Sequence, residues 1–155
     1  MNNDLAYEQF IDALCARTGS ERSPSRHIRF DLTVNGTLFS LVPSTGMQGT
    51  LDGIAFFGEV GPLPEHGKAE AAIRLLESNL YMVGTDTPIY CCHPERPGHV
   101  ILAGRMPLRN TSADKGLEAL AFLAGMAQDA RTSMSPSTAS AGPAARKATA
   151  SKLRK

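Results

Sequence analysis

The sequence predicts an α+β domain with a twisted antiparallel sheet, in the order α-β-β-β-α-β-β-α. Three observations lead to this prediction. Apolar residues recur at helical spacing near the start, in the middle and near the end of residues 1–131. Between these stretches, apolar and polar residues alternate as they do in half-buried strands. Short turns join the alternating stretches, which favours antiparallel pairing and an α+β class.

The first predicted helix begins in the Asn2-Asn3-Asp4 cap region and ends before Gly19. Its apolar side chains follow the i, i+3, i+4 spacing of one helix face. They are Tyr7, Phe10, Ile11, Leu14 and Cys15. A polar loop, residues 20–25, separates this helix from the first strand.

A β-hairpin is predicted next. Its first strand alternates polar residues with the apolar Ile28, Phe30, Leu32 and Val34. Asn35-Gly36 then supplies a type I′ turn, because both residues tolerate positive φ. Thr37–Val42 is the returning strand. Thr50–Val60 is a third strand of the same meander, which the 61–64 segment ends.

The second predicted helix runs from about Glu65 to Tyr81. Its apolar stripe consists of Ala69, Ala72, Ile73, Leu76 and Leu80. Leu75 lies off this stripe, so the apolar surface of the helix is wider than one packing seam requires.

A second pair of strands is predicted at Ile89–Cys92 and His99–Met106, joined by the turn-forming segment 93–98. The last helix begins with a sequence like a capping box, Thr111-Ser112-Ala113-Asp114, whose acidic residue follows the cap by three positions. Its apolar stripe consists of Leu117, Leu120, Ala121, Ala124 and Ala127.

Charge and composition divide the chain into a body, residues 1–131, and a basic tail, residues 132–155. The tail is rich in Ser, Ala, Thr and Pro and lacks aromatic residues, so we expect it to be disordered. Five of the 16 basic residues lie in the tail, which leaves 11 bases against 15 acids in the body, a net charge of about −4. An acidic body argues against a nucleic-acid-binding domain.

Candidate chemistry is confined to Cys91, Cys92, His93 and His99. Zinc would need about four N or S ligands, whereas adjacent cysteines of a strand point to opposite faces. A nucleophilic Cys92 would need an orienting group and oxyanion donors, which the neighbouring sequence does not supply. The glycines between 46 and 61 match neither a P-loop nor a dinucleotide fingerprint. We therefore expect no catalytic residue, no metal and no cofactor.

The expected location is the cytosol. No apolar run approaches the roughly 18–20 residues of a membrane-spanning helix, and the first residues lack the pattern of a secretory signal. Three cysteines cannot close a disulfide framework, which fits reduced thiols.

Large apolar side chains are in surplus on the first helix and the first three strands. The strands carry them on both faces, as Leu38-Phe39 and Phe56-Phe57 show. One face can form the core, and the other must be covered by a partner subunit, a bound peptide or the protein's own helices.

Over residues 4–131 the chain resembles the class I type III secretion chaperones, the Tir-chaperone or CesT-like family. The resemblance lies in the order of elements and in four stretches. They are Phe30-Asp31-Leu32-Thr33-Val34-Asn35-Gly36-Thr37, Gly58-Glu59-Val60-Gly61-Pro62-Leu63-Pro64, Leu75-Leu76-Glu77-Ser78-Asn79-Leu80 and Val100-Ile101-Leu102-Ala103-Gly104-Arg105-Met106-Pro107-Leu108. Two features depart from the family pattern: the basic tail, and a last helix that ends Gln128-Asp129-Ala130-Arg131 without an aromatic residue.

The resemblance implies a cytoplasmic, non-catalytic homodimer from a Gram-negative bacterium. Such a chaperone binds the N-terminal segment of a secreted virulence effector and presents it to the secretion ATPase. Carried over to this chain, the dimer contacts are Ile73, Leu76 and Leu80. The effector contacts are Phe10, Leu14, Ile28, Phe30, Leu38 and Phe56.

Two alternatives remain open. One is a metal-binding protein or thiol enzyme built around Cys91–His99. The other is a dimeric regulator that binds nucleic acid through its basic tail, in a salt-sensitive manner.

Overall fold

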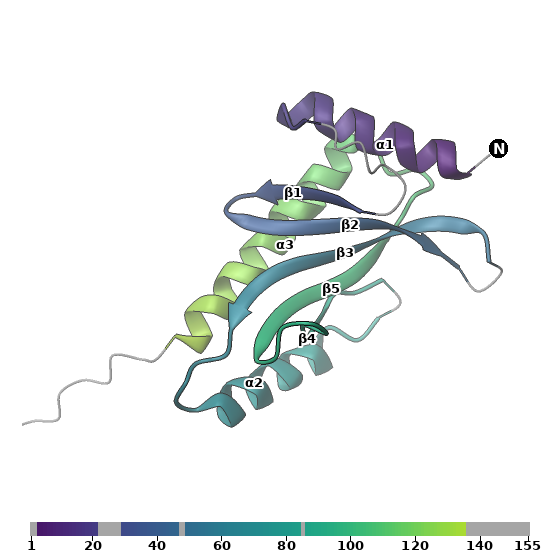
Figure 1. The fold of residues 1–155 in the computed structure, drawn as a ribbon. Coiled ribbons are helices and arrows are strands. Elements are labelled where there is room, and N and C mark those ends of the chain that lie inside the picture. Colours follow the sequence, from purple (N-terminus) through teal and green to yellow (C-terminus); the bar gives the residue numbers. More distant parts are fainter. Residues whose placement is uncertain (1–2, 22–28, 47–48, 85, 136–155) are drawn as a thin grey trace, which may run out of the picture.

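The computed structural model describes residues 3–21, 29–46, 49–84 and 86–135 (Figure 1). The helices are α1 (Asn3–Thr18), α2 (Lys68–Tyr81) and α3 (Ala113–Met134). The strands are β1 (Phe30–Val34), β2 (Thr37–Thr45), β3 (Leu51–Pro62), β4 (Ile89–Cys92) and β5 (His99–Pro107). The predicted order α-β-β-β-α-β-β-α is confirmed. Ile28, the predicted start of the first strand, and the tail from residue 136 lie outside the described residues.

The strands form one antiparallel sheet in the order β1-β2-β3-β5-β4. The predicted hairpin turn is confirmed, since Asn35 and Gly36 have φ of 47° and 77°. β3 continues two residues beyond the predicted end at Val60, because Gly61 and Pro62 still pair with β5 after a register shift. The break predicted at Gly61 is thus a bulge inside the strand.

α1 and α3 cover one face of the sheet, and Figure 1 shows α3 crossing it obliquely. The core lies between these helices and the sheet. Phe39, Leu14, Leu41, Ile54, Leu102 and Leu120 are its largest fully buried side chains. Two cross-strand pairs, Phe39 with Gly58 and Phe56 with Gly104, place an aromatic ring over a glycine. A Cβ at either glycine would lie within 2.6 Å of the ring, so both glycines are needed for this packing.

Two helix boundaries differ from the sequence prediction. α2 begins at Lys68 rather than Glu65, after Gly67 in the left-handed conformation. The N-cap of α3 is Ser112, whose Oγ accepts from the Lys115 N–H, while the Thr111 hydroxyl donates to the Pro107 carbonyl. The cap is therefore one residue later than predicted, because Thr111 binds the preceding strand.

The far end of α3 is fixed to the sheet by Arg131. Its guanidinium donates to the carbonyl oxygens of Val60 at 2.7 Å and Glu59 at 2.6 Å, and to the buried Thr37 hydroxyl at 3.0 Å. These bonds satisfy backbone carbonyls at the bulge of β3. The helix continues past Arg131 to the buried Met134, so the folded body extends beyond the boundary at 131 expected from composition.

Candidate protein-binding surfaces

The face of the sheet opposite α1 and α3 is called the open face. Strand alternation gives it Asp31, Thr33, Leu38, Ser40, Val42, Ala55, Phe57, Glu59, Ile101, Ala103 and Arg105. Phe57 is 37% exposed, whereas its neighbour Phe56 points into the core. The open face thus combines a half-exposed apolar centre with charged side chains around it.

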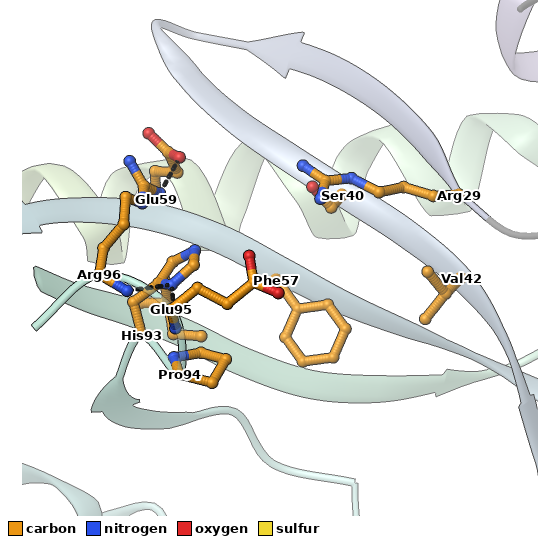
Figure 2. A pocket seen from close by; sticks show the side chains of 10 residues that line it. Arg29, Ser40, Val42, Phe57, Glu59, His93, Pro94, Glu95 and Arg96 are labelled. Carbon is orange, nitrogen blue, oxygen red and sulfur yellow. Dashed lines mark hydrogen bonds and ion pairs between the residues drawn. The ribbon is translucent and has the colours of Figure 1, made fainter.

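A cleft of about 220 Å³ lies on the open face (Figure 2). Phe57, Val42 and Ile101 supply apolar lining, and Arg29, Glu59 and Arg96 supply charged groups. This volume suits one apolar side chain of a bound peptide rather than a whole small-molecule ligand.

Ion pairs hold the charged groups of this cleft. Arg29 Nε and Ser40 Oγ each donate to Asp31 Oδ1 at 2.7 Å, and Arg96 pairs with Glu59. Burial alone would raise the pKa of the Asp31 carboxyl, but the hydrogen bonds from Arg29 and Ser40 lower it below its ordinary value. Arg29 and Arg96 thus neutralise Asp31 and Glu59, and Glu95 adds a further carboxylate to the lining of the cleft.

The turn between β4 and β5 forms one wall of the cleft, and Figure 2 shows His93 and Pro94 there beside Arg96. His93 Nδ1 accepts from the backbone N–H groups of Glu95 and Arg96, both at 3.1 Å. The imidazole therefore fixes the turn and so positions the Arg96 side chain. His93, which the sequence analysis considered for metal binding or catalysis, therefore has a structural role in the turn.

A second surface, the α2–β4 surface, is formed by five exposed apolar side chains of α2 and the residues that follow it. They are Ile73, Leu76, Leu80, Tyr81 and Val83, with exposed fractions from 54% for Ile73 to 88% for Tyr81. The exposed Ile89 of β4 pairs with Ala103 and therefore belongs to the open face. α2 packs on its own sheet through Ala71 and Leu75 instead. Leu75, which lies off the predicted stripe, is thus the residue that faces the core, and the stripe itself faces outward.

A groove of about 270 Å³ accompanies the α2–β4 surface. It lies between α2 and the adjoining strand, with Ala72, Leu75, Leu76, Tyr90 and Val100 in its lining. A grouping of exposed large apolar side chains beside an apolar groove is typical of a protein–protein contact.

The structure separates the residues predicted to contact an effector. Phe10, Leu14, Phe30 and Phe56 are at most 6% exposed and belong to the core. Leu38 is half-buried on the open face. Ile28 lies outside the described residues. The three predicted dimer residues, Ile73, Leu76 and Leu80, lie together on the α2–β4 surface.

Sequence reasoning missed Phe57, Tyr81, Val83 and Ile89. The strand period could have found Phe57, because Phe56 and Phe57 must face opposite sides of the sheet, and Gly104 leaves room on the core side for the Phe56 ring. No periodic signal covers Val83, which follows the end of α2.

No disulfide joins Cys15, Cys91 or Cys92, and the part of the chain that the structure describes contains no cluster of three or more potential metal-ligating residues. Burial, with a smaller contribution from neighbouring Cys92, raises the pKa of the Cys91 thiol. A raised pKa reduces the thiolate fraction and thus the nucleophilicity of Cys91.

Within the described residues, each helix is too short or too polar to cross a membrane. No protein-family model matches the chain, and no curated protein matches its sequence.

Solved structures of type III secretion chaperones share the fold. The Yersinia pestis type III secretion chaperone SycH, solved in complex with a stable fragment of YscM2, gives a TM-score of 0.59 at 15% identity, covering 79% of this chain and 98% of that chain. A chain of the heterodimeric ExoU–SpcU complex from the type III secretion system of Pseudomonas aeruginosa gives 0.59 at 16% identity, covering 81% and 98%. A chain of the HopA1–SchA chaperone–effector complex gives 0.60 at 13% identity, covering 83% and 95%. The chain therefore has the fold of type III secretion chaperones.

Proposed function

We propose that this chain is a type III secretion chaperone that binds the N-terminal segment of a cognate effector. It keeps that segment soluble and competent for secretion, and presents it to the secretion apparatus, with the secretion ATPase as the receiving partner. The observation that carries this proposal is the fold, which is shared with a type III secretion chaperone solved with a bound protein fragment and with a chain of a chaperone–effector complex. The protein would act in the cytoplasm of a Gram-negative bacterium, without catalysis and without a cofactor.

The open face supports the proposal as an effector-binding surface. Its half-exposed Phe57, with Leu38 and Val42, offers apolar contacts to an extended segment. Burying one large apolar side chain contributes about 1.5–3 kcal/mol before ordering costs. Several such contacts would hold a segment reversibly. Of the side chains first predicted to contact the effector, Leu38 would act directly, and the buried Phe10, Leu14, Phe30 and Phe56 would support the sheet from the core.

A homodimer through the α2–β4 surface is the second part of the proposal. Ile73, Leu76 and Leu80 are spaced three and four residues apart, so the stripe is nearly symmetric about Leu76. An antiparallel two-fold contact would place Ile73 opposite Leu80 of the second copy and the two Leu76 side chains together.

The test is a pull-down from the native cell with the tagged full-length protein, combined with light scattering of the purified product. We expect a dimer that retains one dominant secreted protein through that protein's N-terminal region. Phe57→Asp should lose this protein and remain dimeric. Phe122→Asp is the matched control, because Phe122 is an exposed phenylalanine on α3. A monomer that retains no secreted protein would contradict the proposal.

A further inference from the structure

The edge of β4 is occupied by a side chain of α2. Asn79 Nδ2 donates to the Tyr90 carbonyl oxygen at 2.9 Å, and the Tyr90 N–H donates to Asn79 Oδ1 at 2.7 Å. A neighbouring antiparallel strand would form the same pair of bonds with Tyr90. The Asn79 amide therefore takes the place of a strand.

The other backbone positions of this edge offer few donors. β4 is the last strand of the sheet, and it pairs with β5. Because Tyr90 directs its N–H and carbonyl away from β5, alternation within β4 gives the same direction to Cys92. Pro88, directly before the strand, lacks an N–H. Of the two β4 residues whose backbone faces this edge, Tyr90 is bonded to Asn79, so Cys92 alone offers an N–H there.

Both partners of the Asn79–Tyr90 pair are held in place. The Tyr90 hydroxyl donates to the Met126 carbonyl oxygen of α3 at 3.2 Å, and Leu75 anchors α2 in the core. Next to this edge lie the exposed apolar side chains of Ile89 and Leu76. An open edge strand beside such a surface is prone to unwanted edge-to-edge pairing.

We propose that Asn79 is a specificity-determining residue that closes the β4 edge to strand addition. Copies of the protein then associate at this end of the sheet through side chains of the α2–β4 surface. Such a contact gives a dimer, whereas pairing between strand edges could continue from one copy to the next. Removing the Asn79 amide exposes the Tyr90 backbone and permits pairing with the β4 of another copy.

A consequence concerns the opposite edge. β1 contains no proline, and the pairing of Val34 with Thr37 across the two-residue turn directs the backbone groups of Asp31 and Thr33 away from β2. A peptide that adds to the sheet as a strand is therefore directed to β1. This consequence rests on the proposed function, whereas the closure of β4 does not.

The test uses the full-length protein and three variants. Asn79→Ala removes both bonds to Tyr90. Ser78→Ala is the control, because the Ser78 hydroxyl bonds only within α2, to the Arg74 carbonyl at 2.9 Å. The double variant Asn79→Ala with Cys92→Lys leaves the Tyr90 backbone uncovered but places a lysine on the edge, which opposes strand pairing. Mass is measured by light scattering at rising protein concentration, and exchange of the Tyr90 amide by NMR.

We expect Asn79→Ala to form species that exceed the wild-type mass and grow with concentration, with Tyr90 amide exchange about 5-fold faster. Ser78→Ala should match the wild type. The double variant should return to the wild-type mass while its Tyr90 amide still exchanges faster. Should Asn79→Ala fail to fold, Asn79→Asp replaces it, because the carboxylate keeps the acceptor for the Tyr90 N–H and loses the donor.

Wild-type mass for Asn79→Ala at every concentration would overturn the proposal, since Asn79 would then only join α2 to β4. Larger species that persist in the double variant would also overturn it, because association would not depend on the strand edge. Neither result depends on whether the wild-type protein captures a secreted effector, which the pull-down measures separately.

Discussion

Phe56 and Phe57 are consecutive residues of β3 that serve opposite faces of the sheet. The Phe56 ring lies over Gly104 in the core and is 3% exposed, whereas Phe57 lines the cleft of the open face and is 37% exposed. The sheet therefore carries apolar side chains on both faces. Helices α1 and α3 cover only one of these faces.

The first prediction compares these two residues. Phe56→Ala should lower the free energy of unfolding by about 3–5 kcal/mol, because it leaves a cavity in the core. Phe57→Ala should change it by less than about 1 kcal/mol. Urea denaturation of both variants measures the difference. Equal losses of stability would contradict the assignment of the two faces.

The second prediction concerns the dimer. Leu76→Glu should convert the protein to a folded monomer, because it places two carboxylates at the centre of the proposed two-fold contact. Leu76 is 64% exposed, so the single chain should tolerate the change. Leu5→Glu on α1, at another exposed leucine, is the matched control. Light scattering reports the mass, and a Leu76→Glu dimer would place the subunit contact elsewhere.

The third prediction concerns alkaline pH. Tyr7 is buried, its hydroxyl donates to the Leu41 carbonyl oxygen at 3.1 Å, and burial raises its pKa from 10.0 to about 12. Because the folded pKa is raised, the stabilising contribution is complete below about pH 10 and is lost as the pH rises toward 12. The loss is about 2–3 kcal/mol. Denaturation at several pH values should show this slope for the wild type and a smaller one for Tyr7→Phe.

The fourth prediction concerns the C-terminal boundary. Deleting residues 136–155 should leave the melting temperature nearly unchanged. Deletion from residue 132 should lower the free energy of unfolding by about 1–3 kcal/mol, because it removes the buried Met134 and the last turn of α3. The first deletion also tests the nucleic-acid alternative. Salt-sensitive DNA binding that disappears with residues 136–155 would support that alternative instead of the chaperone proposal.

The order of elements could be predicted from sequence because helix and strand periods are local properties. The type I′ turn at Asn35-Gly36 and the apolar stripe of α2 follow from residue type and spacing alone, but the exposure of that stripe does not. The end of β3 could not be predicted in this way. Gly61 and Pro62 are poor strand residues, and they extend β3 because β5 pairs with them and Arg131 binds the carbonyls at the bulge.

The division between core and surface was the least predictable property. Apolar residue type alone does not say which face the two outer helices cover, so Phe10, Leu14, Phe30 and Phe56 could be assigned to an effector surface as easily as to the core. The Asn79–Tyr90 pair joins residues 11 positions apart through a side chain and a backbone, for which the sequence carries no periodic signal.

The most direct test of the chaperone proposal is a calorimetric titration with the purified N-terminal segment of the captured secreted protein. The wild-type protein and Phe122→Asp should bind this segment with the same affinity. Phe57→Asp should bind it at least about 10-fold more weakly, because it loses one large apolar contact on the open face. Equal affinity for all three proteins would contradict the open face as the effector-binding surface, and absence of binding to the wild type would contradict the chaperone function itself.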